Sequence, residues 1–394
     1  MNSKTLLLAV CGALACQGSS PAGRWAGTID TLPSGIAIVS NPSQGIWQPG
    51  NEWRIVEEVR IGATEGTGPE TFGDIQLLRI DPAGRFYVFE SQAQELRVFD
   101  PSGAHLRTIG REGSGPGEFR MAIGMDWAPD GTLWVLDPRN NRFSIIDTSG
   151  TFLGSKPSIG GIMSIPWPGG FDDGGWLYHY APRPSDNEIG RELVLVRYDT
   201  MLVPHDTIEM PQYAGEREFF LLQNENAYMR TPVPFSPDLE WRLTRTGEIW
   251  SALTGEYRLI QCDAGGDTSR IIVREFDPIP VADADIDSAI AGMEWFTRMG
   301  GKIDRSKFPG VKPALETFFV DDGGRVWVLP VTAPEDKDRV LDVFDAAGRY
   351  LGRVRLPFRL ETYSPPIIRG NMMYAVILDE LDVPYVIRAR IETG

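Results

Sequence analysis

Short apolar stretches alternate with glycine-containing turns along most of the chain, and one pattern recurs six times. A glycine is followed by any residue, an apolar residue and then tyrosine or tryptophan, as in Gly84-Arg85-Phe86-Tyr87 and Gly131-Thr132-Leu133-Trp134. The remaining aromatic positions are Tyr178, Trp250, Trp327 and, after one extra residue, Tyr374. The basic spacing is about 45 residues, and two units are longer by roughly 25–30. Repeats of this length that are rich in short strands are typical of β-propeller blades.

Each unit divides into strands and turns, most clearly in the second unit. There, strands are predicted over 123–127, 133–136 and 142–146, with a fourth beginning near Phe152. The Asp130-Gly131 pair predicts the first turn, because glycine accepts a positive φ. A later turn of the form Asp-x-x-Gly recurs at 100–103, 147–150, 263–266 and 345–348. The third unit keeps Asp199 but has Leu202 in place of the glycine, so we expect a different turn there.

The two ends of the chain complement each other. Residues 53–61 have the pattern of an outer strand without a blade of its own, and the last unit, about 366–392, has sequence for only three strands. If the N-terminal strand completes the last blade, the ring closes and its free edges disappear. The sequence therefore predicts an all-β fold, a six-bladed β-propeller closed by an N-terminal strand, with a small helical insertion.

One segment resembles an NHL repeat. It runs through residues 113–119 (GSGPGEF), an Asp-Gly turn, residues 133–137 (LWVLD) and then Asn140, Asn141 and Arg142. With it, the whole is similar to bacterial six-bladed β-propeller proteins with NHL-like repeats, many of which are exported lipoproteins. The resemblance covers roughly residues 52–392 and is strongest in the first two units. It implies a fold and a compartment, but no assigned activity.

The first residues have the features of an export signal. A short basic start is followed by an apolar run over 6–15, which is too short to span a membrane as a helix. Ala13-Leu14-Ala15-Cys16 resembles a lipobox, which implies a signal peptide over 1–15, lipidation of Cys16 and a flexible tether over 16–23. The alternative is an ordinary signal cleaved after a small residue, with Cys16 incidental.

Charge and composition narrow the function classes. The chain of 394 residues has a formal net charge of −16, which argues against binding nucleic acid or docking on anionic lipid. Its apolar content of 42% suffices for a folded core. Removal of Cys11 with the signal and lipidation of Cys16 would leave Cys262 without a disulfide partner. We expect Cys262 to be a small buried residue in a strand.

Two long units contain insertions, over about 211–237 and 282–312. The first carries aromatic residues and prolines and is predicted to be an ordered loop. Within the second, Ile286, Ile290, Met293 and Phe296 follow helical spacing, with Asp283 or Asp285 as a cap. We expect one helix lying on the propeller. Both insertions connect an outer strand to the next inner strand, so we expect them on the face where propeller ligands usually bind.

Candidate binding residues follow from the same geometry. The starts of first strands, the ends of second strands and the loops after them meet on that face. The hypothetical ligand-binding set is Glu90, Arg120, Asp137, Arg142, His179 and Tyr180. The alternative for Asp137 and Arg142 is that they hold the loop between the second and third strands. The alternative for the rest is that these groups satisfy one another.

Sequence motifs for catalysis or metal binding are weaker than the pattern that predicts the ligand-binding residues. His105 and His205 are predicted at the starts of outer strands, and only His179 could approach the channel, so a three-histidine zinc site is not expected. Glu90 and Asp137 are equivalent carboxylates on adjacent blades, too few for a convincing cation site. The glycines of residues 110–117 lack a following Lys-Ser/Thr, so a connector is favoured over a phosphate loop. We assign no catalytic residue, metal or cofactor.

The preferred function is a monomeric ligand- or protein-binding propeller at the bacterial cell envelope, exported and attached to the membrane only through its N-terminal lipid. Its partner would be a small polar ligand, a protein or a peptide. The alternative is a metal-dependent hydrolase or lyase of the lactonase or amidating-lyase propeller type.

Overall fold

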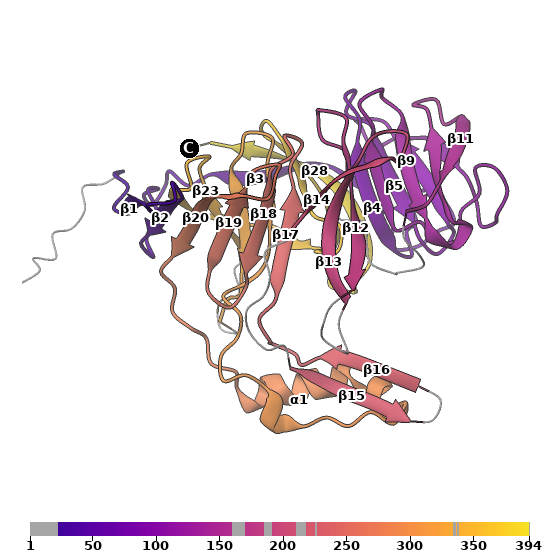
Figure 1. Ribbon diagram of the computed structural model, residues 1–394. Helices are drawn as coiled ribbons and strands as arrows, with labels where there is room; N and C mark the ends of the chain where they lie inside the picture. Colours follow the sequence, from indigo (N-terminus) through magenta and orange to yellow (C-terminus); the bar gives the residue numbers. More distant parts are fainter. Residues whose placement is uncertain are drawn as a thin grey trace, which may run out of the picture.

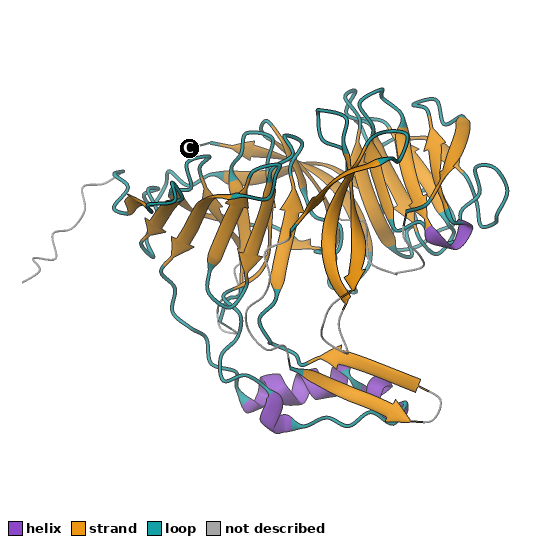
Figure 2. Ribbon diagram, in the orientation of Figure 1, coloured by secondary structure: helices purple, strands orange, loops and turns teal. Residues whose placement is uncertain are grey.

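Strands make up nearly all of the regular structure in the computed structural model (Figure 1; Figure 2). The structure describes residues 23–159, 170–184, 191–209, 218–224, 227–333, 336 and 339–393. The predicted signal peptide, Cys16 and all of the tether except residue 23 lie outside these residues. The described strands form the six blades of the predicted six-bladed β-propeller.

The first, second and third blades follow one another along the chain. The first comprises β4 (Ile75–Ile80), β5 (Phe86–Glu90), β6 (Glu95–Phe99) and β7 (His105–Ile109), and the second β8 (Gly124–Trp127), β9 (Leu133–Asp137), β10 (Arg142–Ile146) and β11 (Phe152–Pro157). The third comprises β12 (Leu177–Pro184), β13 (Arg191–Tyr198) and β14 (Pro204–Ile208), with Phe171 bridged to Leu177 on its inner side.

The other three blades complete the ring. The fourth comprises β17 (Leu239–Leu243), β18 (Ile249–Leu253), β19 (Arg258–Cys262) and β20 (Thr268–Arg274), and the fifth β21 (Leu315–Val320), β22 (Val326–Pro330), β23 (Val340–Phe344) and β24 (Tyr350–Arg355). The sixth contains β25 (Arg359–Leu360) and β26 (Ile367–Arg369) on one side of β27 (Met372–Leu378), then β28 (Pro384–Glu392) and β3 (Arg54–Ile61).

The N-terminal strand closes the ring as expected. β3 pairs antiparallel with β28, with Arg54 opposite Glu392 and Ile61 opposite Val386. A strand from the start of the chain is therefore the outermost strand of the last blade. This arrangement pairs the edge that β28 would otherwise expose.

Residues before β3 contribute two strands that the sequence analysis did not predict. β1 (Thr28–Thr31) and β2 (Ala37–Asn41) form a hairpin, and β2 pairs in parallel with β20 on the outside of the fourth blade. Asn41 fixes this attachment: its carboxamide nitrogen donates to the Val273 and Gly348 carbonyls, and its oxygen accepts from the Tyr350 amide. Residues 42–53, which we call the N-terminal strap, continue from β2 to β3.

The recurrent Asp-x-x-Gly turn is present where predicted, and the third unit corrects one expectation. At Asp199 the carboxylate accepts from the Met201 and Val203 amides, and the Leu202 amide donates to the Asp199 carbonyl. These are the bonds that Asp100 makes around Gly103. The turn does not differ, because Leu202 itself adopts the left-handed conformation, with φ 64°.

The two insertions form one small unit, seen below the propeller in Figure 1. A hairpin of β15 (Phe219–Asn224) and β16 (Ala227–Pro232) comes from the first insertion, and α1 (Asp283–Gly292) and α2 (Glu294–Arg298) come from the second. Phe220 and Leu222 pack with Met293 and Phe296 in a shared core. The single helix expected on the propeller is thus two short helices packed on the hairpin. The first insertion, expected to be an ordered loop, contains this β-hairpin instead. Asp285 caps α1 by accepting from the Ala282 amide.

Apolar side chains between blades form the main core. Second and third strands are buried almost throughout, as in β5 and β23, because neighbouring blades cover both faces. Trp250 and Trp327 are fully buried in such interfaces, and Cys262 is buried in β19, as predicted. Among the described residues, neither helix is long and apolar enough to cross a membrane.

Candidate functional site

Glu90 and Asp137 occupy equivalent places at the ends of β5 and β9, and both bind backbone amides. The Glu90 carboxylate accepts from the amides of Gly73, Asp74 and Ala93. The Asp137 carboxylate accepts from the Arg120, Met121 and Asn140 amides and from the Asn140 side chain. Both carboxylates are buried, so their oxygen atoms hold the loops of their own blades together.

Arg142 and Arg120 also lie beside the glycine-rich connector, but they differ in exposure. The Arg142 guanidinium donates to the carbonyls of Ser114, Gly115 and Glu118. This is the loop-holding role that the sequence left open, although Arg142 and Asp137 fix the connector through separate backbone groups. Arg120 contributes its amide to Asp137, and its side chain is exposed.

His179 and Tyr180 lie on β12, the second strand of the third blade. The His179 Nδ1 atom lies 2.7 Å from the Tyr180 carbonyl oxygen, and burial lowers the pKa of His179. Tyr180 packs edge-on against Trp241, and burial raises the pKa of its phenol. Tyr180 therefore packs between the third and fourth blades, whereas His179 contacts Phe143 of the second blade.

A large cavity lies on another part of the propeller, along the fifth blade. Its volume is about 2230 Å³, and it is walled by the N-terminal strap and by the fourth, fifth and sixth blades. None of the six predicted binding residues lines it. A smaller cavity of about 570 Å³ adjoins it, sharing Pro313, Val331 and Thr332 in its lining.

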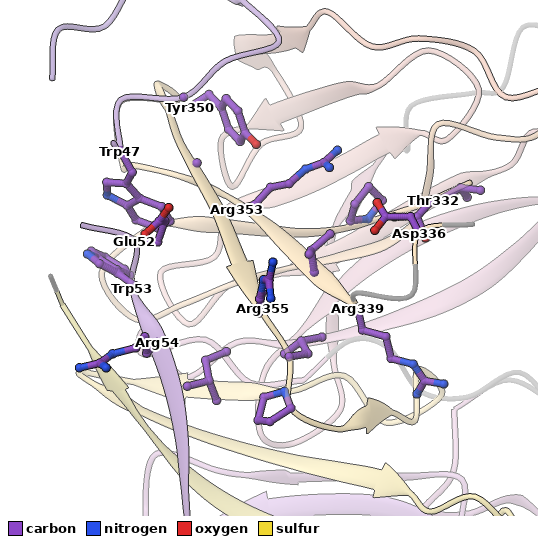
Figure 3. A pocket seen from close by; sticks show the side chains of 18 of the residues that line it. Trp47, Glu52, Trp53, Arg54, Thr332, Asp336, Arg339, Tyr350, Arg353 and Arg355 are labelled. Atoms are coloured by element: carbon purple, nitrogen blue, oxygen red, sulfur yellow. The ribbon is translucent and has the colours of Figure 1, made fainter. Parts of the chain in front are cut away.

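Figure 3 shows how the walls of this cavity face one another. Trp47, Glu52 and Trp53 from the strap stand on one side, and Thr332 and Asp336 stand on the other, with Arg353 and Arg355 of β24 between them. The strap is tied to the fifth blade by its backbone, since the Trp47 amide donates to the Leu351 carbonyl at 2.8 Å. Trp47 and Trp53 contact each other, with ring centroids 5.0 Å apart.

A buried carboxylate lies behind the cavity wall and binds four of the lining residues. Asp342 on β23 is fully buried; its Oδ1 accepts from the phenol of Tyr350 at 2.6 Å and its Oδ2 from that of Tyr257 at 2.5 Å. Arg353 and Arg274 form ion pairs with the same carboxylate, at 3.2 and 3.3 Å. Burial and the Asp342 charge raise the pKa of Tyr257 well above its usual range, so both phenols stay neutral donors.

The sequence contains a signal for this site that the predicted set of binding residues does not include. Asp342 interrupts an otherwise apolar strand (Val340–Phe344), and a carboxylate at such a position needs buried partners. Arg353 and Arg355 alternate with Gly352 and Val354, which places both arginines on one side of β24. Their convergence with a strap from the N-terminus depends on tertiary structure alone.

The described residues give no metal centre. No three His, Cys, Asp or Glu side chains among them lie together as ligands to an ion. His105 and His205 stand at or near the starts of β7 and β14, as predicted, where they contact Thr108 and Asp199.

Comparisons with known proteins agree with the fold. Residues 67–152 match the family model DUF5128, described as 6-bladed beta-propeller. None of the curated proteins matches the chain. A candidate exported protein from Bacteroides fragilis has a similar structure, with a TM-score of 0.51 and 11% identity, covering 90% of this chain and 99% of that chain.

Two further solved structures have lower TM-scores. A DUF4221 family member from Bacteroides vulgatus has a TM-score of 0.45 at 13% identity, covering 87% of this chain and 99% of that chain. Virginiamycin B lyase from Staphylococcus aureus has a TM-score of 0.44 at 10% identity, covering 86% and 99%. At these identities the likeness concerns the fold and not the chemistry.

Proposed function

We propose that this protein is a recognition protein of the bacterial envelope, which binds a polar ligand in the cavity along the fifth blade. The observation that carries the proposal is the cavity itself, which is walled by three blades and the strap. Its lining mixes tryptophan, arginine, threonine and carboxylate side chains, as binding sites for polar small molecules do. The lipobox-like sequence ending at Cys16, and the likeness in fold to a candidate exported protein, support the envelope location.

The strap is part of the proposed site. It follows Asn41, whose three hydrogen bonds to Val273, Gly348 and Tyr350 join β2 to the fourth and fifth blades, and it ends at β3 in the sixth. One wall of the cavity is therefore a segment anchored at both ends. A wall fixed in this way favours binding, because little conformational entropy remains to be lost when a ligand arrives.

The test fills the cavity and measures binding to defined probes. Thr332→Trp places a large ring at the junction of the two cavities, and Thr207→Trp on exposed β14 of the third blade is the matched control. Calorimetry with short neutral and charged sugars and peptides should detect a probe that binds the wild type and Thr207→Trp. The same probe should lose affinity for Thr332→Trp. Equal affinity for all three proteins, or no binding of any probe, would refute the proposal.

A further inference from the structure

The N-terminal part of the chain covers the outer edges of three blades unequally. β2 pairs with β20 of the fourth blade over five residues, and β3 pairs with β28 of the sixth blade along most of its length. At the fifth blade, between them, the strap contacts only the start of β24, where the Ile46 and Trp47 amides donate to the carbonyls of Tyr350 and Leu351. Within the described part of the chain, no strand pairs with the outer side of β24.

The hydrogen-bond pattern of β24 shows which residue faces outward beyond this contact. In an antiparallel pair, alternate residues bond to the partner strand, and the residues between them face the other way. Leu356 bonds toward β23, since its amide donates to the Arg339 carbonyl at 2.7 Å. Arg353, three residues earlier, therefore directs its backbone amide and carbonyl away from β23, as Leu351 does toward the strap. Among the described residues, neither of these two Arg353 groups has a hydrogen-bond partner.

Side chains leave the edge at Arg353 accessible from the cavity. The Arg353 guanidinium is held by the Asp342 carboxylate on β23, with its Nε atom 3.2 Å from Oδ1. The preceding residue, Gly352, has no side chain, and a Cβ atom there would lie 2.7 Å from the ring of Trp47. Gly352, Arg353 and Trp47 all line the cavity, and Figure 3 shows β24 crossing it between the strap and Thr332.

The outermost strands of the first three blades have no outer neighbour either, but they differ from β24 in their surroundings. β7, β11 and β14 end their sheets in the same way, and most of their residues are exposed or half-buried. None of these strands lines either cavity. β24 lies inside a cavity walled by the strap and three blades. Such walls admit a single extended chain and keep the edge of another folded domain away.

The size and charge of the cavity favour a polymer that is recognised through its backbone. Its volume of about 2230 Å³ is more than twice the roughly 300–1,000 Å³ that is typical of small-molecule sites. The lining contains seven arginines and seven aspartates or glutamates, so its formal charges balance and do not select a ligand by net charge. Trp47 and Trp53 add apolar surface on the strap side. A peptide can pair its backbone with a strand edge and place alternate side chains against such rings.

We infer that the cavity binds an extended polypeptide segment of a partner protein, which adds as a strand to β24 at Arg353. This inference rests on the proposed function and specifies its ligand. The Arg353 amide donates to a carbonyl of the bound segment, and the Arg353 carbonyl accepts from one of its amides. The segment thereby continues along β24 the backbone contacts that the strap makes with Tyr350 and Leu351.

The experiment asks whether binding depends on alternate backbone amides of the ligand. Peptides are selected from a displayed library of random heptapeptides on the wild type, after counter-selection on Thr332→Trp, and their capped synthetic forms are measured by calorimetry. One backbone nitrogen at a time is then methylated. Methylation of an amide that faces β24 removes a hydrogen bond and should weaken binding at least about tenfold. Methylation of the amides between them should change affinity less than about threefold.

Arg353→Pro and Arg353→Ala are the matched pair of protein variants. Both lose the guanidinium, but only proline lacks the amide, and proline is tolerated on an outermost strand where that amide faces away from the sheet. Arg353→Pro should bind a selected peptide at least about tenfold more weakly than Arg353→Ala, with near-UV circular dichroism establishing that both are folded. The methylation series uses the wild type, so it tests the inference even if Arg353→Pro does not fold.

Several outcomes would overturn the inference. Peptides that bind the wild type and not Thr332→Trp, but show no alternation on methylation, would leave the proposed function standing without strand addition. The same holds if a sugar binds in the cavity and no peptide does. Equal peptide binding by folded Arg353→Pro and Arg353→Ala would also contradict it. A dimer in size-exclusion chromatography with light scattering, dissociated by Arg353→Pro, would identify the occupant as a second copy of this chain instead of a partner.

Discussion

Replacing Asp342 with asparagine should destabilise the protein far more than removing a surface charge. The substitution conserves shape but neutralises a carboxylate that is 0% exposed and serves two arginines and two tyrosines. Each Asp342 oxygen receives one phenol and faces one guanidinium. An amide nitrogen in place of either oxygen cannot accept, so one phenol and one guanidinium lose their acceptor.

The size of the destabilisation follows from the number of buried donors that lose their acceptor. A buried donor left without an acceptor costs about 1–3 kcal/mol, and more for a charged donor. Removing one partner of a buried ion pair costs about 3–5 kcal/mol, because the other charge stays buried. Arg274 is the partner that remains, and its side chain is only 6% exposed. These costs overlap, so we expect Asp342→Asn to lower the free energy of unfolding by about 4 kcal/mol.

The assay is urea unfolding at pH 7, followed by tryptophan fluorescence and far-UV circular dichroism. The control is Glu57→Gln, which breaks an exposed ion pair with Arg60 and should cost at most about 1 kcal/mol. Near-UV circular dichroism establishes that each variant is folded before unfolding begins. If Asp342→Asn unfolds within about 1 kcal/mol of Glu57→Gln, the buried network does not hold the fourth and fifth blades together.

Three further predictions test other parts of the argument. Leu202→Gly should be more stable than Leu202→Ala by about 1 kcal/mol in urea unfolding. Both variants lose the leucine side chain, but only glycine accepts φ 64° without strain. Equal stability of the two variants would contradict a strained turn. Burial lowers the pKa of His179 in the folded state, so the unfolded chain takes up the proton first as pH falls below about 6.5. Wild-type stability should therefore decline more between pH 7 and pH 5 than that of His179→Gln, and identical pH profiles would show that this histidine does not contribute. Cys16→Ser should move the protein from the membrane fraction to the soluble fraction, and labelled fatty acid should enter only the wild type; absence of label in the wild type would mean that the signal is of the ordinary kind.

The sequence predicted what depends on local pattern and strand count. A last unit with only three strands required a partner, and β3 is that partner. Asp-x-x-Gly turns were predictable because the carboxylate bonds only to its own turn. Leu202 was not predicted to form this turn because leucine does not favour φ 64°, and it adopts this angle only within the folded structure. The local sequence alone does not indicate this.

Features that depend on distant segments were not predictable in the same way. Phe220 and Met293 lie in different insertions, and nothing in either segment specifies the other as its packing partner. The helix pattern over 283–299 was correct in its apolar positions, yet Met293 interrupts the helix where it meets the hairpin. Likewise, the strap becomes a cavity wall only because Asn41 attaches β2 to two blades.

The cavity lies along blades whose second strands end without a carboxylate, and a physical reason connects the two facts. In the first two blades a carboxylate at the end of the second strand accepts hydrogen bonds from neighbouring backbone amides. The carboxylate and these amides are therefore paired with each other within the blade. The equivalent positions in the fourth and fifth blades are Leu253 and Pro330, which accept nothing through their side chains. Loops that are not held this way can open outward, and Pro330 lines the cavity. The polar groups of these two blades instead contact each other across the blade interface, as Asp342 does with Tyr257 and Arg274.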